Sequence, residues 1–205
     1  MTITVSIVIR IIVIVILLKI LWLTTTACGN AILSSVMRRI LRIPMNTFDI
    51  RHTLFIVRGV LHYYNIPFWL TEGTALGAIR EGKVIKTDTD IDIGITSSNR
   101  ETLISQALPL FKKMGFKQWK QKRHIIGLVH NYIRVDIMIV EKDKYCIDIP
   151  CNEMISYLSN LIRAPLYDTY YWCMPLAYII QIYGEDWKIP QYQKKPGAPP
   201  YSAVE

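Results

Sequence analysis

The chain has 205 residues, enough for one domain of ordinary size and little beyond it. Its formal net charge of +8 favours anionic partners such as phosphates, nucleotides, acidic glycans or a lipid surface. Nucleic acid is not expected, because the sequence has neither zinc-finger spacing nor an RNP-type aromatic motif. Zinc has little support, since the four cysteines, Cys28, Cys146, Cys151 and Cys173, form no C-x-x-C pair.

The first residues are the most hydrophobic part of the chain, and we predict a signal anchor or transmembrane helix at 1–27. The apolar run from Ile3 to Leu23 is about as long as the roughly 20 residues that span a bilayer, and only Arg10 and Lys19 interrupt it. A cleaved signal peptide and a buried strand remain alternatives.

A basic linker is predicted at residues 28–47. Its arginines follow the apolar run, and the positive-inside rule alone would keep this flank in the cytosol. Residues 31–43 could instead form a basic amphipathic helix that lies on the membrane surface. The charges therefore leave the topology open.

Residues 48–190 have the patterns of a folded domain in which helices and strands are mixed without a regular βαβ repeat, so the predicted fold class is α+β. Residues 191–205 are too rich in proline and too poor in apolar side chains to fold alone, and we predict a proline-rich tail there. In chain order we expect a helix at 48–66 ended by Pro67, a short strand at 68–70, a turn and short helix at 72–82, an acidic strand at 88–95, a helix at 97–116 capped by Ser97 or Ser98, three short strands between 116 and 140, and a last helix between Pro175 and Gly184.

The acidic strand alternates carboxylates with β-branched residues. Asp90 and Asp92 share one face, because successive side chains of a strand point to opposite sides, and the isoleucines between them share the other. Two carboxylates this close repel each other and raise each other's pKa unless a cation lies between them. A calcium loop of the EF-hand type is excluded, since its sixth and twelfth positions would be Ile93 and Asn99. A solvated edge strand that merely carries acids stays an alternative.

A second strand, predicted at 131–140, repeats the pattern with Asp136 on its polar face beside Arg134. If it pairs with the acidic strand, Asp136 joins Asp90 and Asp92 in a cluster of the kind that holds Mg²⁺ or Mn²⁺. Two such ions could clamp the oxygens of an in-line phosphoryl displacement. Asp136 could also be an ordinary strand acid. Asp88 lies at the turn into the strand, and we expect it to face solvent or support the site rather than bind metal.

The segment before the acidic strand offers groups that suit phosphate. Gly73 and Thr74 lie where a strand ends and a helix starts, so backbone N–H groups and the helix dipole could receive an anion, although the motif alone reads as a simple turn. Arg80, Lys83 and Lys86 follow and could neutralise phosphate oxygens, or could be solvated surface charges.

Residues 68–95 resemble the LicD/fukutin family of the nucleotidyltransferase-fold superfamily, and look most similar to its fukutin and fukutin-related branch. The family pattern is an apolar strand, a Gly-Thr turn, Leu-Gly with a following arginine, and a D-x-D-x-G strand. Here these positions are Gly73, Thr74, Leu76, Gly77, Arg80, Asp90, Asp92 and Gly94, with Asp136 and the closing YGEDW at 183–187 as further matches. Lys86, Thr87 and Thr89 depart from the residues that many relatives carry before and between these acids.

The resemblance implies a nucleotidyltransferase-like mixed sheet flanked by helices. It also implies a metal-dependent transferase that moves a phosphorylated alcohol, such as ribitol phosphate or phosphocholine, from a CDP-activated donor to a sugar hydroxyl in glycosylation. Asp90 and Asp92 would bind Mg²⁺ or Mn²⁺, Asp136 would complete the set and help to deprotonate the acceptor, and Gly73 and Thr74 would hold the donor diphosphate. The branch suggests a single-pass membrane protein of the Golgi or ER with a luminal catalytic domain, which opposes the charge-based orientation.

Two other functions remain open. The chain could be a non-catalytic, membrane-anchored partner of a full-length relative, because it lacks the large stem of the animal enzymes and differs from the family before the acids. A nucleotide-adding enzyme that acts on RNA or small molecules is a third reading.

Overall fold

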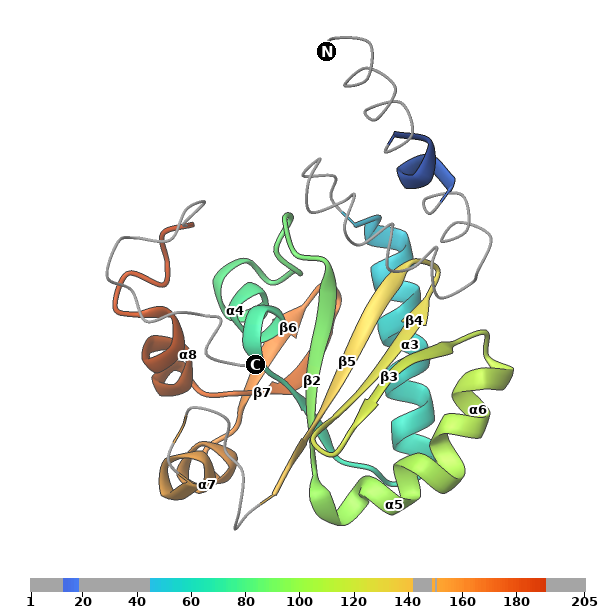
Figure 1. Cartoon of the computed structure of the whole chain (residues 1–205). Helices are drawn as coiled ribbons and strands as arrows, with labels where there is room; N and C mark the ends of the chain where they lie inside the picture. Colours follow the sequence, from blue (N-terminus) through green and yellow to red (C-terminus); the bar gives the residue numbers. More distant parts are fainter. Residues whose placement is uncertain (1–12, 19–44, 142–148, 150, 191–205) are drawn as a thin grey trace, which may run out of the picture.

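The computed structural model describes residues 13–18, 45–141, 149 and 151–190 (Figure 1). The predicted tail lies wholly outside these residues, and the predicted anchor and linker lie mostly outside them. Among the residues described, no helix is long and apolar enough to cross a membrane. The anchor therefore stays a prediction, and so does the proposed linker.

The domain is built on a seven-stranded mixed sheet in the order β3-β4-β5-β2-β1-β7-β6. Two acidic segments meet at its centre, where β2 pairs in parallel with β5 and antiparallel with β1. The strands are β1 (Phe68–Leu70), β2 (Asp90–Thr96), β3 (Lys117–Lys122), β4 (Ile125–His130), β5 (Ile133–Val140), β6 (Ile162–Leu166) and β7 (Thr169–Cys173). The predicted α+β class is confirmed, and the two acidic strands pair, which was the condition for placing Asp136 with Asp90 and Asp92.

Helices lie on both sides of this sheet. In Figure 1, α3 passes behind β4 and β5, and α4 lies beside β2 on the nearer side. The helices are α3 (Thr47–Tyr63), α4 (Glu72–Glu81), α5 (Arg100–Thr102), α6 (Leu108–Lys113), α7 (Cys151–Ser159) and α8 (Leu176–Tyr183), with a 3-10 turn at Ser97–Asn99 and a π-helical segment at Leu103–Ala107. The predicted helices at 48–66, 72–82 and 176–183 are confirmed within a few residues.

The helical stretch after β2 begins differently from the prediction. Thr96 takes the N-cap position instead of Ser97 or Ser98, and its side chain makes no capping hydrogen bond. Its hydroxyl instead lies 2.8 Å from the Ser98 hydroxyl and accepts a hydrogen bond from the Asn99 amide at 2.8 Å. These local hydrogen bonds favour the tight 3-10 turn over a capping box.

The apolar faces of the two central strands form the core. Ile91, Ile93 and Ile95 are 0% exposed, and so are Val135 and Ile137 on β5. Their parity leaves the carboxylates of both strands on the opposite face, as the alternation predicted. The register then sets Asp92 beside Asp136.

A part of the sheet was not predicted from the sequence. The helix α7 and the strands β6 and β7 follow β5, and β7 pairs in parallel with β1. These elements extend the sheet beyond β1 and bring α8 to the start of α4, where Tyr178 lies against Thr71.

Candidate metal and phosphate site

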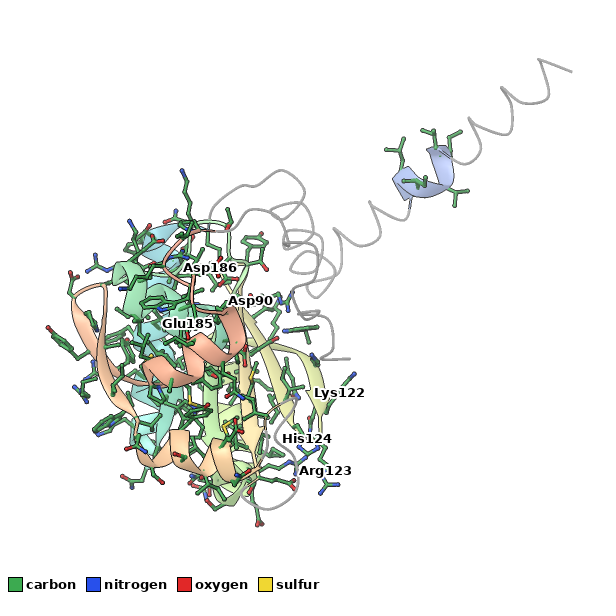
Figure 2. All side chains as sticks on the ribbon, turned by 90° about the vertical axis from the view of Figure 1, so that its left-hand side faces the viewer. Asp90, Lys122, Arg123, His124, Glu185 and Asp186 are labelled. Atoms are coloured by element: carbon green, nitrogen blue, oxygen red, sulfur yellow. The ribbon has the colours of Figure 1, made fainter. Side chains whose placement is uncertain are left out.

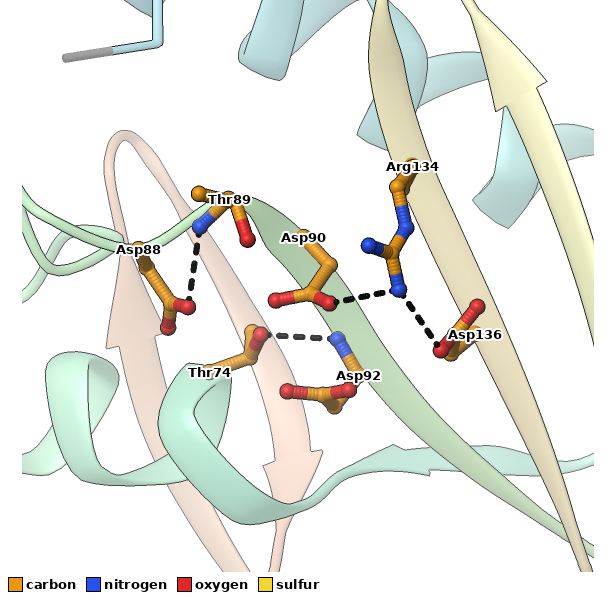
Figure 3. A network of polar contacts seen from close by, with 7 residues as sticks. All are labelled: Thr74, Asp88, Thr89, Asp90, Asp92, Arg134 and Asp136. Atoms are coloured by element: carbon orange, nitrogen blue, oxygen red, sulfur yellow. Dashed lines mark hydrogen bonds and ion pairs between the residues drawn. The ribbon is translucent and has the colours of Figure 1, made fainter. Parts of the chain in front are cut away.

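Three carboxylates gather where β2 begins. Asp88, Asp90 and Asp92 each offer an oxygen, and these oxygens lie within 4.8 Å of one another (Figure 3). Asp88, which was expected to face solvent or to support the site, has its carboxylate in this cluster, where it could offer a metal ligand. Asp88 precedes the strand, so strand parity does not govern its direction; its backbone N–H donates to the Ile85 carbonyl at 2.9 Å, and its Oδ1 accepts from the Thr89 N–H at 3.0 Å.

The first turn of α4 packs directly against this cluster. A Cβ atom on Gly73 would lie 2.5 Å from Asp88 Oδ2, so only glycine leaves room for the carboxylate here. The Thr74 hydroxyl accepts a hydrogen bond from the Asp92 N–H at 2.8 Å and joins α4 to β2. Because the first N–H groups of a helix lack intrahelical acceptors and carry partial positive charge, this end of α4 suits anions. The structure thus places Gly73 and Thr74 beside these acids, and their role as holders of a donor diphosphate stays a prediction.

Glu72, which was not predicted as part of the site, lies at the start of α4. Glu72 has a positive φ of 46°, and its Oε1 accepts a hydrogen bond from the Tyr178 hydroxyl at 2.5 Å. The Thr71 hydroxyl lies 3.0 Å from the same tyrosine oxygen. This buried contact fixes the start of α4 against α8, and the charge of Glu72 contributes to the raised pKa of Asp92.

Arg134 connects the acids of the two strands. Its Nη2 lies 3.2 Å from Asp90 Oδ2 and 3.5 Å from Asp136 Oδ2. Asp136 is 6% exposed, and its Oδ1 is buried without a hydrogen-bond partner among the described residues. Asp136 is thus the register partner of Asp92 on β5. The third oxygen of the close group with Asp90 and Asp92 comes from Asp88.

Burial controls the protonation of this site. It raises the pKa of Asp88 to about 7, with the charge of Asp90 as the second cause. Burial also raises the pKa of Asp92 well above its ordinary range, and the neighbouring carboxylates add to this. The pKa of Asp136 is raised by burial as well, although the Arg134 guanidinium opposes that shift.

Burial therefore disfavours the ionised forms of Asp88, Asp92 and Asp136. Carboxylate oxygens are the ligands that Mg²⁺ and Mn²⁺ prefer. A divalent cation would favour the ionised forms that burial opposes. The donor set of Asp88, Asp90 and Asp92 therefore fits such a metal.

The basic residues expected at the phosphate lie elsewhere. Arg80 donates to Glu81 Oε1 from Nε at 3.0 Å and from Nη2 at 2.7 Å, and Lys83 Nζ lies 4.0 Å from Glu81 Oε2. Arg80 lies in the last turn of α4, roughly 10 Å along the helix axis from Gly73, and Lys83 follows the Gly82 C-cap of that helix. The structure does not bring Arg80 and Lys83 to the carboxylates. Arg134 takes that place, and strand parity is the signal that points to it, since it lies two residues before Asp136 on the same face.

Another basic group is equally remote. Lys122 ends β3, and Arg123 and His124 form the turn to β4, at the opposite end of the sheet from Asp90 (Figure 2). Arg123 is engaged there by Glu141, with contacts of 3.3 and 3.2 Å.

The fold and the site together define an α+β domain with a carboxylate cluster beside the start of a helix, a donor set that could hold a metal ion. Residues 65–149 match the family model described as LicD/FKTN/FKRP, nucleotidyltransferase domain. The match includes Gly73, Thr74, Asp90, Asp92 and Asp136, and it supports the LicD family and a transferase. It does not separate the fukutin-related branch from the rest of the family.

Two curated relatives each match about two fifths of the chain. An uncharacterized protein of Rickettsia typhi is 37% identical over 81 residues, which are 40% of this chain and 26% of that protein. An uncharacterized protein of Rickettsia prowazekii is 36% identical over 80 residues, which are 39% and 29% of the two chains. The match thus spans between a quarter and a third of the length of these relatives.

Solved structures with a similar arrangement include nucleotidyltransferases. The antibiotic-resistance factor ANT(2'')-Ia in solution is 15% identical with a TM-score of 0.46, over 64% of this chain and 69% of that one. The lincosamide antibiotic adenylyltransferase LnuA with lincomycin bound is 16% identical with a TM-score of 0.46, over 62% and 82% of the two chains.

Proposed function

We propose that this protein is a LicD-like transferase that uses Mg²⁺ or Mn²⁺ to move a phosphorylated alcohol from a CDP-activated donor to a sugar hydroxyl of a glycan. The observation that carries the proposal is the group of Asp88, Asp90 and Asp92, whose oxygens lie within 4.8 Å of one another against the first turn of α4. The group falls inside the segment that matches the LicD family model.

In the proposed reaction, the acceptor hydroxyl oxygen attacks the phosphorus that bears the alcohol. A new phosphorus–oxygen bond forms, the bond from that phosphorus to the CMP oxygen breaks, and CMP leaves with the electron pair. Asp88, Asp90 and Asp92 would hold the cation, which neutralises charge on the donor phosphates. The N–H groups in the first turn of α4, at Gly73 and Thr74, would receive the donor diphosphate.

Asp136 is the proposed acceptor of the proton from the sugar hydroxyl. Its buried Oδ1 has no hydrogen-bond partner among the described residues, and burial raises its pKa toward the range in which a carboxylate serves as a general base. Arg134 would keep this carboxylate in place through its contact at 3.5 Å.

The test is CMP release from CDP-ribitol, CDP-glycerol and CDP-choline with Mn²⁺, using wild type and Asp90→Asn. We expect wild type to release CMP from one donor in the presence of an acceptor. Asp90→Asn should release CMP at least 100-fold more slowly, because the variant loses a group that stabilises charge on the transferred phosphate. Asp168→Asn is the matched control, because Asp168 is 73% exposed on the turn between β6 and β7 and pairs with Arg51.

Equal rates for wild type and Asp90→Asn would refute the proposed chemistry. Metal-dependent donor binding without any CMP release would instead indicate the non-catalytic partner of a related transferase. Release of pyrophosphate from nucleoside triphosphates would favour a nucleotide-adding enzyme.

We further propose that residues 1–27 anchor the protein in a membrane of the Golgi or ER, with the catalytic domain in the lumen. The apolar run with only Arg10 and Lys19 inside it supports this location. Protease protection of a C-terminal tag in intact vesicles tests it, since digestion of the tag would place the domain in the cytosol.

A further inference from the structure

A guanidinium group lies between the carboxylates of the two central strands. Arg134 Nη2 contacts Asp90 Oδ2 at 3.2 Å and Asp136 Oδ2 at 3.5 Å (Figure 3). Its side chain is 23% exposed, and that of Asp136 is 9% exposed, so this is a largely buried charge contact. It fills the position between β2 and β5 at which a cation bridging these two acids would sit.

The same guanidinium also lies over an aromatic ring. The Arg134 guanidinium carbon lies 4.5 Å from the centre of the Trp119 ring. Such a cation–π contact strengthens when solvent is partly excluded. Contacts with the acids and with the indole therefore both hold the Arg134 guanidinium in place.

The indole in turn rests on a glycine of the neighbouring strand. A Cβ atom on Gly127 would lie 2.5 Å from Trp119 Nε1 and 2.6 Å from Trp119 Cε2, so the ring needs a bare backbone at this position. Gly127 is the register partner of Asp136, and a shift in the β3–β4 register falls at Trp119. A bulge of this kind re-aims a side chain. Here it directs Trp119 over β4 toward Arg134.

The acids thus divide into two cation positions that share Asp90. One is the group of Asp88, Asp90 and Asp92, whose oxygens lie within 4.8 Å of one another. The other lies between Asp90 and Asp136 and is taken by Arg134. In two-metal phosphoryl-transfer sites a second ion about 3.5–4 Å from the first occupies such a place.

We infer that this site takes a single divalent cation, at Asp88, Asp90 and Asp92, and that Arg134, seated on Trp119, supplies the second positive charge in place of a second ion. The inference rests on the proposed function for the identity of the first cation. An arginine suits this role because it is always charged and binds carboxylates and phosphates in a planar geometry.

The test is the number of Mn²⁺ ions bound by the full-length protein in detergent without donor, from titration calorimetry and from the electron paramagnetic resonance signal of Mn²⁺. We expect wild type to bind one ion with the spectrum of isolated Mn²⁺. Arg134→Ala vacates the place between Asp90 and Asp136 and should bind two ions, with the exchange-coupled spectrum of a close pair. The double variant Arg134→Ala with Asp136→Asn should return to one ion.

Arg163→Ala is the matched control. Arg163 also stacks on a tryptophan, with its guanidinium carbon 5.2 Å from the centre of the Trp172 ring, but it lies on β6 rather than at the carboxylates. This variant should bind one ion, as wild type does.

Two ions in wild type would overturn the inference, whatever the variants do, and would leave the proposed transferase intact. One ion in folded Arg134→Ala would also overturn it. Conversely, one ion in wild type and two in Arg134→Ala, without CMP release from any donor, would support the inference and refute the proposed function.

Discussion

Replacing Asp88 with asparagine should stabilise the metal-free protein at pH 8 and flatten its stability profile between pH 5.5 and pH 8. The pKa of Asp88 rises from 3.8 to about 7 through burial and the charge of Asp90. At pH 5.5 the folded state therefore still holds a proton that the unfolded chain has already lost, and the folded state loses it by pH 8. Stability that is present at acidic pH is lost as the pH rises through about 7.

The pKa values set the size of the effect. With pKa values of 3.8 and about 7, lowering the pH from 8 to 5.5 should add at most about 2 kcal/mol to the free energy of unfolding. Solvent at the partly exposed carboxyl reduces this, so we expect about 1 to 2 kcal/mol. For a chain of this size that is a shift in Tm of roughly 2 to 8 °C.

The assay is thermal unfolding of wild type and Asp88→Asn at pH 5.5 to 8, with EDTA and then with Mn²⁺. With EDTA, the variant should show a smaller rise in Tm on acidification than wild type, because Asp92 and Asp136 still contribute and Asp88 no longer does. At pH 8, Mn²⁺ at about 100 times its Kd should stabilise wild type by about 2.7 kcal/mol and Asp88→Asn much less. Asp168→Asn, at an exposed site, should behave as wild type does in both series.

Parallel profiles for wild type and Asp88→Asn with EDTA would refute the buried, proton-holding Asp88. Equal Mn²⁺ stabilisation of the two proteins would remove Asp88 from the metal site.

Two further substitutions test how α4 supports the cluster. Gly73→Ala should leave the free energy of unfolding within about 1 kcal/mol of wild type, because alanine favours the helix while the new Cβ displaces the Asp88 carboxylate. The same displacement should weaken Mn²⁺ binding roughly 10-fold in calorimetry. Gly59→Ala, where a Cβ meets nothing within 4 Å, should stabilise the protein by about 0.5–1 kcal/mol and leave Mn²⁺ affinity unchanged; equal affinities in both variants would contradict the argument. Thr74→Val should cost about 1–3 kcal/mol in urea unfolding because the Asp92 N–H loses its acceptor, whereas Thr74→Ser should keep most of that stability; equal losses in the two variants would show that the hydroxyl does not matter.

The centre of the fold could be predicted from the sequence because burial acts there through a simple period. The isoleucines of β2 alternate with acids, and β5 repeats the alternation, so each strand has one apolar face for the core. Once the two strands pair, Asp92 and Asp136 must fall on the same face of the sheet. This much follows from parity.

Strand parity does not predict the direction of a side chain that lies outside the strand. Asp88 has the same parity as Asp90, but its direction is set by a turn bond to the Ile85 carbonyl and by the space above Gly73. Both are tertiary features of a connection between α4 and β2. No local pattern specifies them, and for this reason the sequence did not predict that the Asp88 carboxylate lies in the cluster.

The strands beyond β1 were missed because their pattern is weak. β6 is the edge strand of the sheet and contains Pro165, which an edge tolerates but which argues against a strand in sequence. Tyr170 and Trp172 on β7 are 59% and 49% exposed, so the apolar side chains there do not alternate cleanly with polar ones. Only the parallel pairing with β1 makes these segments part of the sheet.

Which cationic side chain lies against the acids depends on strand register and not on closeness in the sequence. Arg80 and Lys83 lie within ten residues of Asp90 along the chain, yet Glu81 engages both of them at the far end of α4. Arg134 lies more than forty residues away and reaches Asp90 because β5 pairs with β2 in a register that sets the two residues side by side. A short motif around the acidic strand identifies the carboxylates, whereas the charge they face depends on which strand the sheet places next to them.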